Sequence, residues 1–276
     1  MPELPEVETV VRSLTPLLLH RSITGVWTSG LPLHLSRAVD EASLSRLLKG
    51  TKITQLQRRG KYILLHVAQA SRKAVMLVHL GMSGRLMVAA ASQARAPHTH
   101  VVLRLDGDQE LRFVDPRRFG QFKVAAASSD LQELLGMGPE PFGDLDAVAL
   151  AESLSNCRAP IKAFLLDQKR IAGVGNIYAC EALFELGVHP NKRASMLRRR
   201  AGDVLAAVRM VLQRGLDNRG TTLRDYVDGT GNSGGNQSAL KVYGREGKAC
   251  LRCGAPVRRQ VDSGRSTFFC AACQRR

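Results

Sequence analysis

The sequence lacks several features that mark whole classes of proteins. No stretch approaches the ~18 consecutive apolar residues that a membrane helix needs, so we expect no membrane span. The first ten residues carry three glutamates and no basic residue, which argues against a secretory signal. Neither an internal repeat nor a heptad pattern is present, which excludes repeat and coiled-coil architectures. We therefore expect a protein of the reducing cytosol.

Acidic residues are also scarce, with 24 Asp and Glu against 40 Lys and Arg, which gives a net charge of +16. The excess is +9 over residues 1–127, zero over 128–240 and +7 over 241–276. Two separated basic stretches favour a polyanionic partner, although charge alone leaves nucleic acid, membrane surfaces and acidic proteins open. A hydrophobic fraction of 44% suffices for packed cores, and 276 residues suggest about two domains.

The apolar pattern divides the chain into a strand-rich and a helix-rich part. Apolar spacing predicts a helix over residues 5–18, which Pro16 ends or bends. Strands are expected at 23–27, 52–56, 62–67, 74–79, 84–88, 100–105, 110–114 and 119–124, and helices at 130–135, 144–154, 161–167, 177–186, 195–216 and 222–226. Closely spaced strands indicate a sandwich or barrel. Residues 91–98 are expected to form a flexible loop and 228–236 a mobile one.

The cysteines indicate a metal site near the end of the chain. Two Cys-x-x-Cys pairs, Cys250 with Cys253 and Cys270 with Cys273, are separated by sixteen residues. Each pair places two thiolates on a tight turn, and two such turns on a hairpin surround one Zn²⁺ tetrahedrally. Four protein ligands leave no open position, so we expect one structural zinc ion. The two other cysteines, Cys157 and Cys180, are expected to be buried small apolar residues.

Six motifs occur in order along the chain, followed by the cysteine pairs. They are PELPEVETV from residue 2, RGKY from 59, HLGMSG from 79, DPRRFG from 115, GVGNIY from 173 and GRSTFFC from 264. Together they resemble the formamidopyrimidine-DNA glycosylase family, bacterial enzymes that excise oxidised purines. The resemblance implies an α+β multidomain protein: an N-terminal β-sandwich with flanking helices, and a C-terminal helical domain with a helix–two-turns–helix motif and a four-cysteine zinc-finger β-hairpin. It also implies that DNA lies in the cleft between them.

We divide the chain into a catalytic β-sandwich domain (1–127), a helical DNA-binding domain (128–236) and a zinc finger (237–276). The resemblance implies a bifunctional glycosylase/AP lyase whose nucleophile is Pro2 after loss of Met1. It implies that Glu3 is the acid/base partner, that Lys61 donates the proton for β-elimination, and that Arg265 serves δ-elimination or binds phosphate. On the residues alone, a proline after the initiator methionine is common, and glutamates at a helix start are favoured by its dipole.

The resemblance further implies which residues open the DNA. Met82, Arg117 and Phe119 match the residues that fill the space of an extruded nucleotide and support its widowed partner base. Without the resemblance, Met82 and Phe119 would be expected in a core. Phosphate contacts are implied for His98, Arg158, Lys162 and Asn176.

Two alternatives remain at this level. One is an endonuclease VIII-like glycosylase for oxidised pyrimidines, and the other is a non-catalytic zinc-finger protein that binds damaged DNA. The chain departs from the family at 234–238, GGNQS, where an aromatic pair is frequent, which leaves lesion preference open. A single chain supplies every role, so we expect a monomer that acts on double-stranded DNA containing oxidised bases or AP sites and is associated with the bacterial nucleoid.

Overall fold

The structure is a computed structural model that describes residues 1–33, 40–126 and 136–275. Its described residues form two compact units. The N-terminal unit comprises the residues before 127 together with 218–235, and the C-terminal unit comprises 136–217 and 236–275. The segment 218–235, which our division of the sequence assigned to the helical domain, thus packs with the N-terminal unit. No helix of the described chain is long and apolar enough to cross a membrane.

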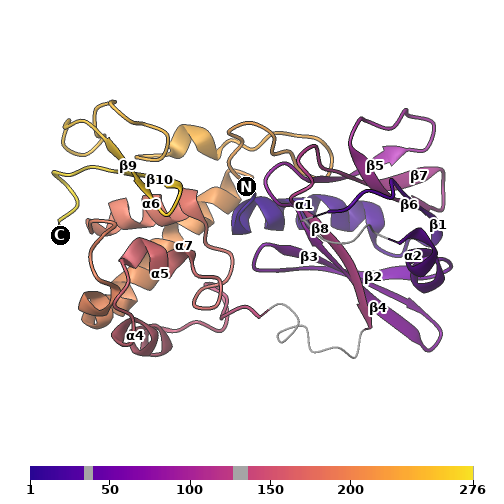
Figure 1. Cartoon of the computed structure of the whole chain (residues 1–276), viewed down its shortest axis with the longest axis horizontal. Helices are drawn as coiled ribbons and strands as arrows, with labels where there is room; N and C mark the ends of the chain where they lie inside the picture. Colours follow the sequence, from indigo (N-terminus) through magenta and orange to yellow (C-terminus); the bar gives the residue numbers. More distant parts are fainter. Residues whose placement is uncertain (34–39, 127–135, 276) are drawn as a thin grey trace. The chain divides into compact units, whose positions relative to one another are not determined.

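The N-terminal unit is a β-sandwich with flanking helices, as expected (Figure 1). Its helices are α1 (Leu4–Leu18) and α2 (Glu41–Leu48). One antiparallel sheet has the order β1-β6-β7-β5, with β1 (Ile23–Thr28), β5 (Arg85–Ala90), β6 (Thr99–Leu105) and β7 (Gln109–Val114). The other has the order β2-β3-β4-β8, with β2 (Lys52–Arg59), β3 (Tyr62–Gln69), β4 (Arg72–His79) and β8 (Gln121–Ala126).

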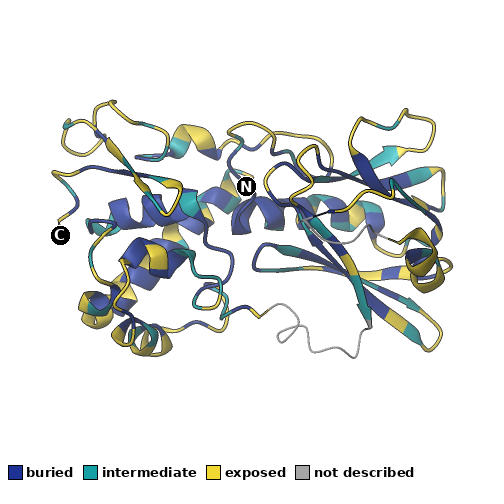
Figure 2. Ribbon diagram, in the orientation of Figure 1, coloured by how far each residue is buried: buried dark blue, intermediate teal, exposed yellow. Residues whose placement is uncertain are grey.

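A single hydrophobic cluster holds this unit together. It combines α1 side chains such as Val7, Val10 and Leu14 with inward-facing residues of both sheets and of α2. Figure 2 shows the corresponding buried stretches on α1 and the strands. The apolar period of α1 therefore orients its N-terminal end against the sandwich. Pro16 lies inside α1, which ends two residues later.

The C-terminal unit is helical and ends in a β-hairpin. Its elements are α4 (Ala147–Ser155), α5 (Ile161–Leu166), α6 (Asn176–Leu186), the 3-10 helix η1 (Ala194–Arg200), α7 (Ala201–Asp217), the 3-10 helix η2 (Asn236–Ala239), β9 (Arg258–Asp262) and β10 (Arg265–Phe269). Strands β9 and β10 pair antiparallel, with Arg265 opposite Asp262. Gly187 ends α6 in the left-handed conformation that favours glycine.

Two local features differ from the expectations, and a third expectation cannot be compared. Helix α2 was not predicted, although Asp40 caps it by accepting the N–H groups of Ala42 and Ser43. Residues 222–226 do not form a helix, and the Thr222 hydroxyl instead donates to the carbonyl oxygen of Tyr226 at 3.0 Å. The helix expected at 130–135 lies outside the described residues.

The segment 240–244 is irregular and forms neither a helix nor a strand. Its three consecutive N–H groups, those of Lys241, Val242 and Tyr243, all donate to the carboxylate of Glu181 at 2.8–2.9 Å. Successive N–H groups of a strand point in opposite directions, so one acceptor cannot serve three in a row. Burial of Glu181 raises the pKa of its carboxyl group above the ordinary value, against the three backbone donors.

Candidate active site and nucleic-acid interface

The start of α1 fixes the backbone of the expected catalytic residues. Pro2 and Glu3 are buried, whereas Met1 is exposed. The Glu6 carboxylate accepts the N–H of Glu3 at 2.8 Å through one oxygen and the N–H of Thr221 at 2.7 Å through the other. Glu6 therefore joins the N-terminal end of the chain to a segment that lies 215 residues later. These two bonds hold the N-terminal end of α1 in place.

Lys61 occupies the tight turn from β2 to β3 and is only 6% exposed. Gly60 has a left-handed backbone conformation, which suits such a turn. Arg58 donates to the carbonyl oxygen of Gly60 at 3.2 Å and forms an ion pair with Glu8 of α1 at 3.1 Å. This pair is a structural link that the sequence did not reveal, because Glu8 was interpreted only as a helix-dipole anion. It connects the helix that begins after Glu3 to the turn that carries Lys61.

Residues 228–236 were expected to be mobile, and most of them lie in the segment 218–235, where hydrogen bonds to Asp228 hold the loop together. Buried Asp228 accepts the N–H groups of Thr230 and Asn232 at 2.9 Å and a bond from Arg219 at 2.7 Å. These donors hold the pKa of Asp228 below its usual range, although burial alone would raise it. Burial and the nearby Glu6 carboxylate raise the pKa of the Tyr226 hydroxyl.

Met82 and Phe119, the expected wedge residues, are exposed rather than buried in the core, at 44% and 40%. Arg117 is also exposed, and its guanidinium carbon lies 4.8 Å from the centre of the Phe119 ring. The loops that carry them touch through their backbones, because a Cβ on Gly81 would lie 2.5 Å from the nitrogen of Gly120. The structure therefore brings these three side chains onto two adjoining loops of the N-terminal unit.

His98 is exposed at the end of the segment expected to be a flexible loop. That segment is instead tied to β7, because Arg112 donates to the carbonyl oxygens of Ala90, Gln93 and Ala94 at 2.6–3.1 Å. Arg112 is 4% exposed, so these bonds are shielded from water. His98 is thus presented by a fixed loop.

In the C-terminal unit, Arg158 is exposed between α4 and α5, and Arg265 is exposed at the start of β10. Asn176 begins α6, and its amide group donates to the carbonyl oxygen of Ser266 at 2.8 Å. Lys162, for which a phosphate contact was implied, is only 3% exposed. Its amine donates to the Thr267 hydroxyl at 2.6 Å, which joins α5 to the hairpin.

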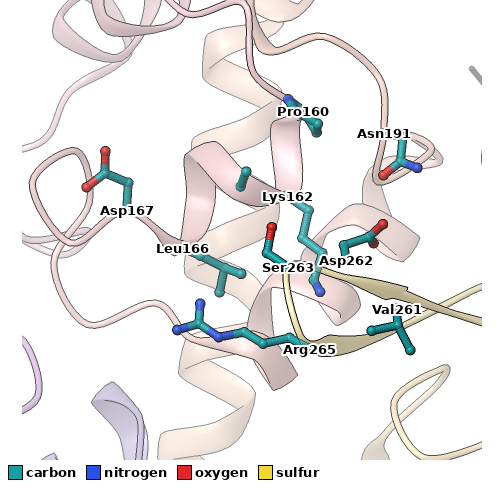
Figure 3. A pocket seen from close by; sticks show the side chains of 10 residues that line it. Pro160, Lys162, Leu166, Asp167, Asn191, Val261, Asp262, Ser263 and Arg265 are labelled. Carbon is teal, nitrogen blue, oxygen red and sulfur yellow. The ribbon is translucent and has the colours of Figure 1, made fainter.

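A cavity of about 710 Å³ lies at this junction (Figure 3). Lys162 reaches from α5 toward the hairpin, and Asp262 and Arg265 line the hairpin side. The Thr267 hydroxyl in turn donates to Asp262, so two consecutive hydrogen bonds link the Lys162 amine to the Asp262 carboxylate. The arrangement holds the hairpin close to its tip, where Arg265 lies opposite Asp262.

The four predicted cysteine ligands converge on one point. Their sulfur atoms all lie within 4.8 Å of one another, with 3.9 Å from Cys250 to Cys273 and 3.5 Å from Cys253 to Cys270. Zinc–sulfur bonds of about 2.3 Å give a tetrahedron with edges of about 3.8 Å, so the cluster fits Zn²⁺. The site takes one structural zinc ion and has no position for a substrate. Cys157 and Cys180 lie outside the cluster and are buried, as expected.

Comparison with protein families matches three successive models. The formamidopyrimidine-DNA glycosylase N-terminal domain matches residues 1–122, the H2TH domain of the same enzymes matches 137–227, and a zinc finger found in FPG and IleRS matches 247–276. The fold and the site thus define a DNA glycosylase with a helix–two-turns–helix domain and a structural zinc finger.

Individual proteins agree. The chain is 48% identical to the formamidopyrimidine-DNA glycosylase of Moorella thermoacetica over 94% of both chains, and 43% identical to that of Chloroflexus aurantiacus over 99% and 98%. A variant of the Lactococcus lactis FPG protein, solved with DNA containing Fapy-dG, shares 31% identity with a TM-score of 0.91 over the whole of both chains. The Lactococcus lactis protein solved with abasic-site DNA gives 0.89 at 31% identity, over 99% and 100%. The chain belongs to the formamidopyrimidine-DNA glycosylase family, which excises oxidised purines and cleaves abasic sites.

Proposed function

We propose that this chain excises 8-oxoguanine and formamidopyrimidines from double-stranded DNA through Pro2 and then nicks the strand by β,δ-elimination. The buried position of Pro2 at the start of α1, with the Glu3 backbone held by Glu6, is the observation that carries the proposal. Removal of Met1 is required, because it converts the proline nitrogen from an amide into a secondary amine. An α-amino group with a pKa of about 8 is roughly 10% neutral at pH 7, whereas a lysine amine is almost fully protonated.

In this proposal the neutral Pro2 nitrogen attacks C1′ of the damaged nucleotide. The glycosidic bond breaks, the base leaves, and Glu3 protonates the sugar ring oxygen as the ring opens. The proton lost by the Pro2 nitrogen leaves with the base, and the nitrogen becomes a permanently charged iminium. The Glu3 carboxylate, which has given its proton to the ring oxygen, then takes a proton from C2′, and that C–H electron pair forms the new double bond as the 3′ C–O bond breaks. The 3′ phosphate then departs, and a second elimination releases the 5′ phosphate. We assign proton donation in the first elimination to Lys61 and support of the second to Arg265.

The same proposal places DNA contacts on both units. Met82 and Phe119 fill the space of the extruded nucleotide, and Arg117 hydrogen-bonds the widowed cytosine. His98, Arg158 and Asn176 contact phosphates, which predicts a steep decrease of affinity with salt. Because Lys162 is bonded to Thr267, we assign it mainly to holding the hairpin, with direct phosphate contact as the alternative. The zinc site, held by Cys250, Cys253, Cys270 and Cys273, stabilises that hairpin.

Borohydride trapping on a duplex with 8-oxoguanine opposite cytosine tests the proposal. The wild-type chain is expected to give a covalent adduct, and Pro2→Gly to give none. Pro16→Ala, a proline change at the far end of α1, is the control that should still trap. Intact mass verifies that Met1 is absent from the active protein. A Pro2→Gly variant that traps like the wild type would contradict the nucleophile.

The two alternatives are separate outcomes of the same experiment. Faster excision of thymine glycol than of 8-oxoguanine would favour the endonuclease VIII-like activity. Binding of the damaged duplex without any trapped adduct would favour a non-catalytic damage-binding protein. We further propose that the chain acts as a monomer in the bacterial cytoplasm, associated with the nucleoid through DNA. Light scattering of the free protein and of its complex measures the number of chains.

A further inference from the structure

Asp115 is a fully buried aspartate, at 0% exposure, in the turn that follows β7. Its carboxylate accepts three hydrogen bonds. One oxygen accepts the Ser83 hydroxyl at 2.7 Å and the N–H of Arg117 at 3.3 Å, and the other accepts the N–H of Gly120 at 2.7 Å. None of the catalytic or DNA-contacting roles assigned above involves this side chain, although it lies within the DPRRFG motif.

Each donor belongs to a loop that carries a DNA-opening residue. Ser83 follows Met82, and Gly120 follows Phe119, while Arg117 is such a residue itself. The carboxylate thus holds both loops from the buried side. The side chains of Met82, Arg117 and Phe119 are exposed on the surface of these loops.

The space around Asp115 leaves little freedom for these loops. A Cβ on Gly120 would lie 3.0 Å from the Asp115 carboxylate and 2.6 Å from the Phe113 ring. A Cβ on Gly81 would meet the backbone of Phe119 at 2.5 Å, so the loops cannot separate or slide without losing close packing.

The main chain of Asp115 extends the same network to the expected phosphate-binding loop. Its N–H donates to the carbonyl oxygen of His98 at 2.9 Å, and its own carbonyl oxygen lies 3.1 Å from Nε2 of His100. His98 has a φ of 63°, an unusual conformation for a residue with a side chain, which this bond helps to fix. One residue therefore connects three DNA-facing loops.

We propose that Asp115 is a positioning residue that holds Met82, Arg117 and Phe119 in one preformed arrangement and thereby sets discrimination of the base opposite the lesion. The inference rests on the DNA-opening roles proposed above for these three residues. An ionised carboxylate offers only acceptors, which is what one hydroxyl and two N–H donors require. An amide at this position turns an NH₂ group toward one of the donors, so that side of the network is lost. The backbone that carries Arg117 is then no longer held in one position relative to the orphaned base.

The test compares single-turnover excision of 8-oxoguanine opposite cytosine and opposite adenine. The ratio of the two rates does not depend on the fraction of active protein, so a partly unfolded variant leaves it unchanged. Asp115→Asn is expected to lower the cytosine preference by about fivefold, and Ser83→Ala, which removes one of the three bonds, by about twofold. Nicking of a preformed abasic-site duplex, normalised to the trapped fraction, should decrease less, since an abasic nucleotide is easier to extrude.

Thr51→Val is the matched control, because it removes a buried hydroxyl that donates to the carbonyl oxygen of Leu48 and lies in no DNA-facing loop. It should leave the ratio unchanged. Arg117→Ala is the positive control and should abolish most of the preference. An unchanged ratio in both Asp115→Asn and Ser83→Ala, with Arg117→Ala effective, overturns the positioning role alone. An unchanged ratio in Arg117→Ala overturns the assignment of Arg117 and with it this inference, while trapping through Pro2 tests the chemistry separately.

Discussion

The β-sandwich and the zinc hairpin position their side chains by different means. In the N-terminal unit, one continuous apolar cluster spans α1, α2 and both sheets, and it orients the helix that begins after Glu3. Around the hairpin the corresponding cluster is small, and two of its seven buried members, Cys250 and Cys270, are metal ligands. Apolar burial therefore supports the helix next to the expected nucleophile, in addition to the bonds of Glu6, whereas zinc would supply stability that the small cluster at the hairpin lacks.

The strongest way to break this comparison is to remove the metal. Cys270→Ser should reduce zinc content from one ion per chain to near zero, because a site of four thiolates loses its closed tetrahedron. Zinc binding contributes about 10–16 kcal/mol to folding in comparable small modules, so the hairpin should unfold and lesion-duplex affinity should decrease at least ~100-fold.

Atomic absorption and electrophoretic titration measure these changes. Cys157→Ala, a buried cysteine outside the cluster, should retain zinc and affinity. Retention of zinc by Cys270→Ser would contradict the four-cysteine assignment.

A cavity made in the core of the sandwich should lower stability and leave the zinc site intact, the reverse of removing the metal. Met76→Ala removes a fully buried side chain of β4 and is expected to cost about 2–5 kcal/mol of unfolding free energy without changing zinc content. Met210→Ala, at 52% exposure on α7, provides the matched control and should cost less than about 0.5 kcal/mol. Urea unfolding monitored by circular dichroism supplies both values. Equal costs for the two methionines would argue against an apolar cluster as the source of stability.

The sandwich also contains a buried carboxylate, Glu110, that forms ion pairs with Arg95 and Arg112 and adds a charged contribution to its stability. Burial alone would raise the pKa of Glu110, but Arg95 and Arg112 outweigh it and hold that pKa below the usual range. The pair therefore contributes stability above the unfolded pKa of about 4.3, and the contribution is lost as pH falls through the lower folded pKa.

Glu110→Gln should cost about 1–3 kcal/mol at pH 7 and flatten the decrease of stability on acidification. Urea midpoints between pH 7 and pH 3 test this, with exposed Glu152→Gln as the control. A steeper acid dependence in Glu110→Gln would reverse the assignment.

The smallest expected effect is on the salt dependence of DNA affinity, and it distinguishes the proposed roles of Arg158 and Lys162. Exposed Arg158→Ala should reduce the slope of log affinity against log salt by about 0.9, the value for one phosphate contact. Lys162→Met should reduce it by less, because its amine is already bonded to Thr267. Fluorescence anisotropy at several salt concentrations measures both slopes. Equal reductions would instead assign a direct phosphate contact to Lys162.

The parts that the sequence predicted are those with a strong local signal. The apolar period of α1, the close succession of the strand segments and the spacing of the four cysteines need no distant partner to be interpreted. The helix over residues 222–226 was predicted wrongly. Residues 240–244 also lacked a local signal, because their N–H groups bond to Glu181, a carboxylate far away in sequence. Helix α2 was missed although its cap, Asp40, is a local signal.

The site shows the same limit. Glu3, Lys61 and the wedge residues could be transferred from motifs, residue by residue, and their roles stay proposals. The supporting bonds could not, since Glu8 meets Arg58 and Asp115 meets Ser83 only after the sheets have formed. A buried aspartate inside a motif of exposed basic residues was nevertheless a usable signal. The burial of Lys162 had no local signal, because its partner Thr267 is 105 residues away.

The bond from Glu6 to Thr221 has a consequence for the newly made protein. A ribosome that has synthesised the whole sandwich still holds a chain whose amino-terminal helix lacks one of its hydrogen-bond partners, and that partner emerges only after α7. The end of the chain that carries Pro2, the proposed nucleophile, therefore gains its last hydrogen-bond partner only after the residues up to Thr221 have been synthesised.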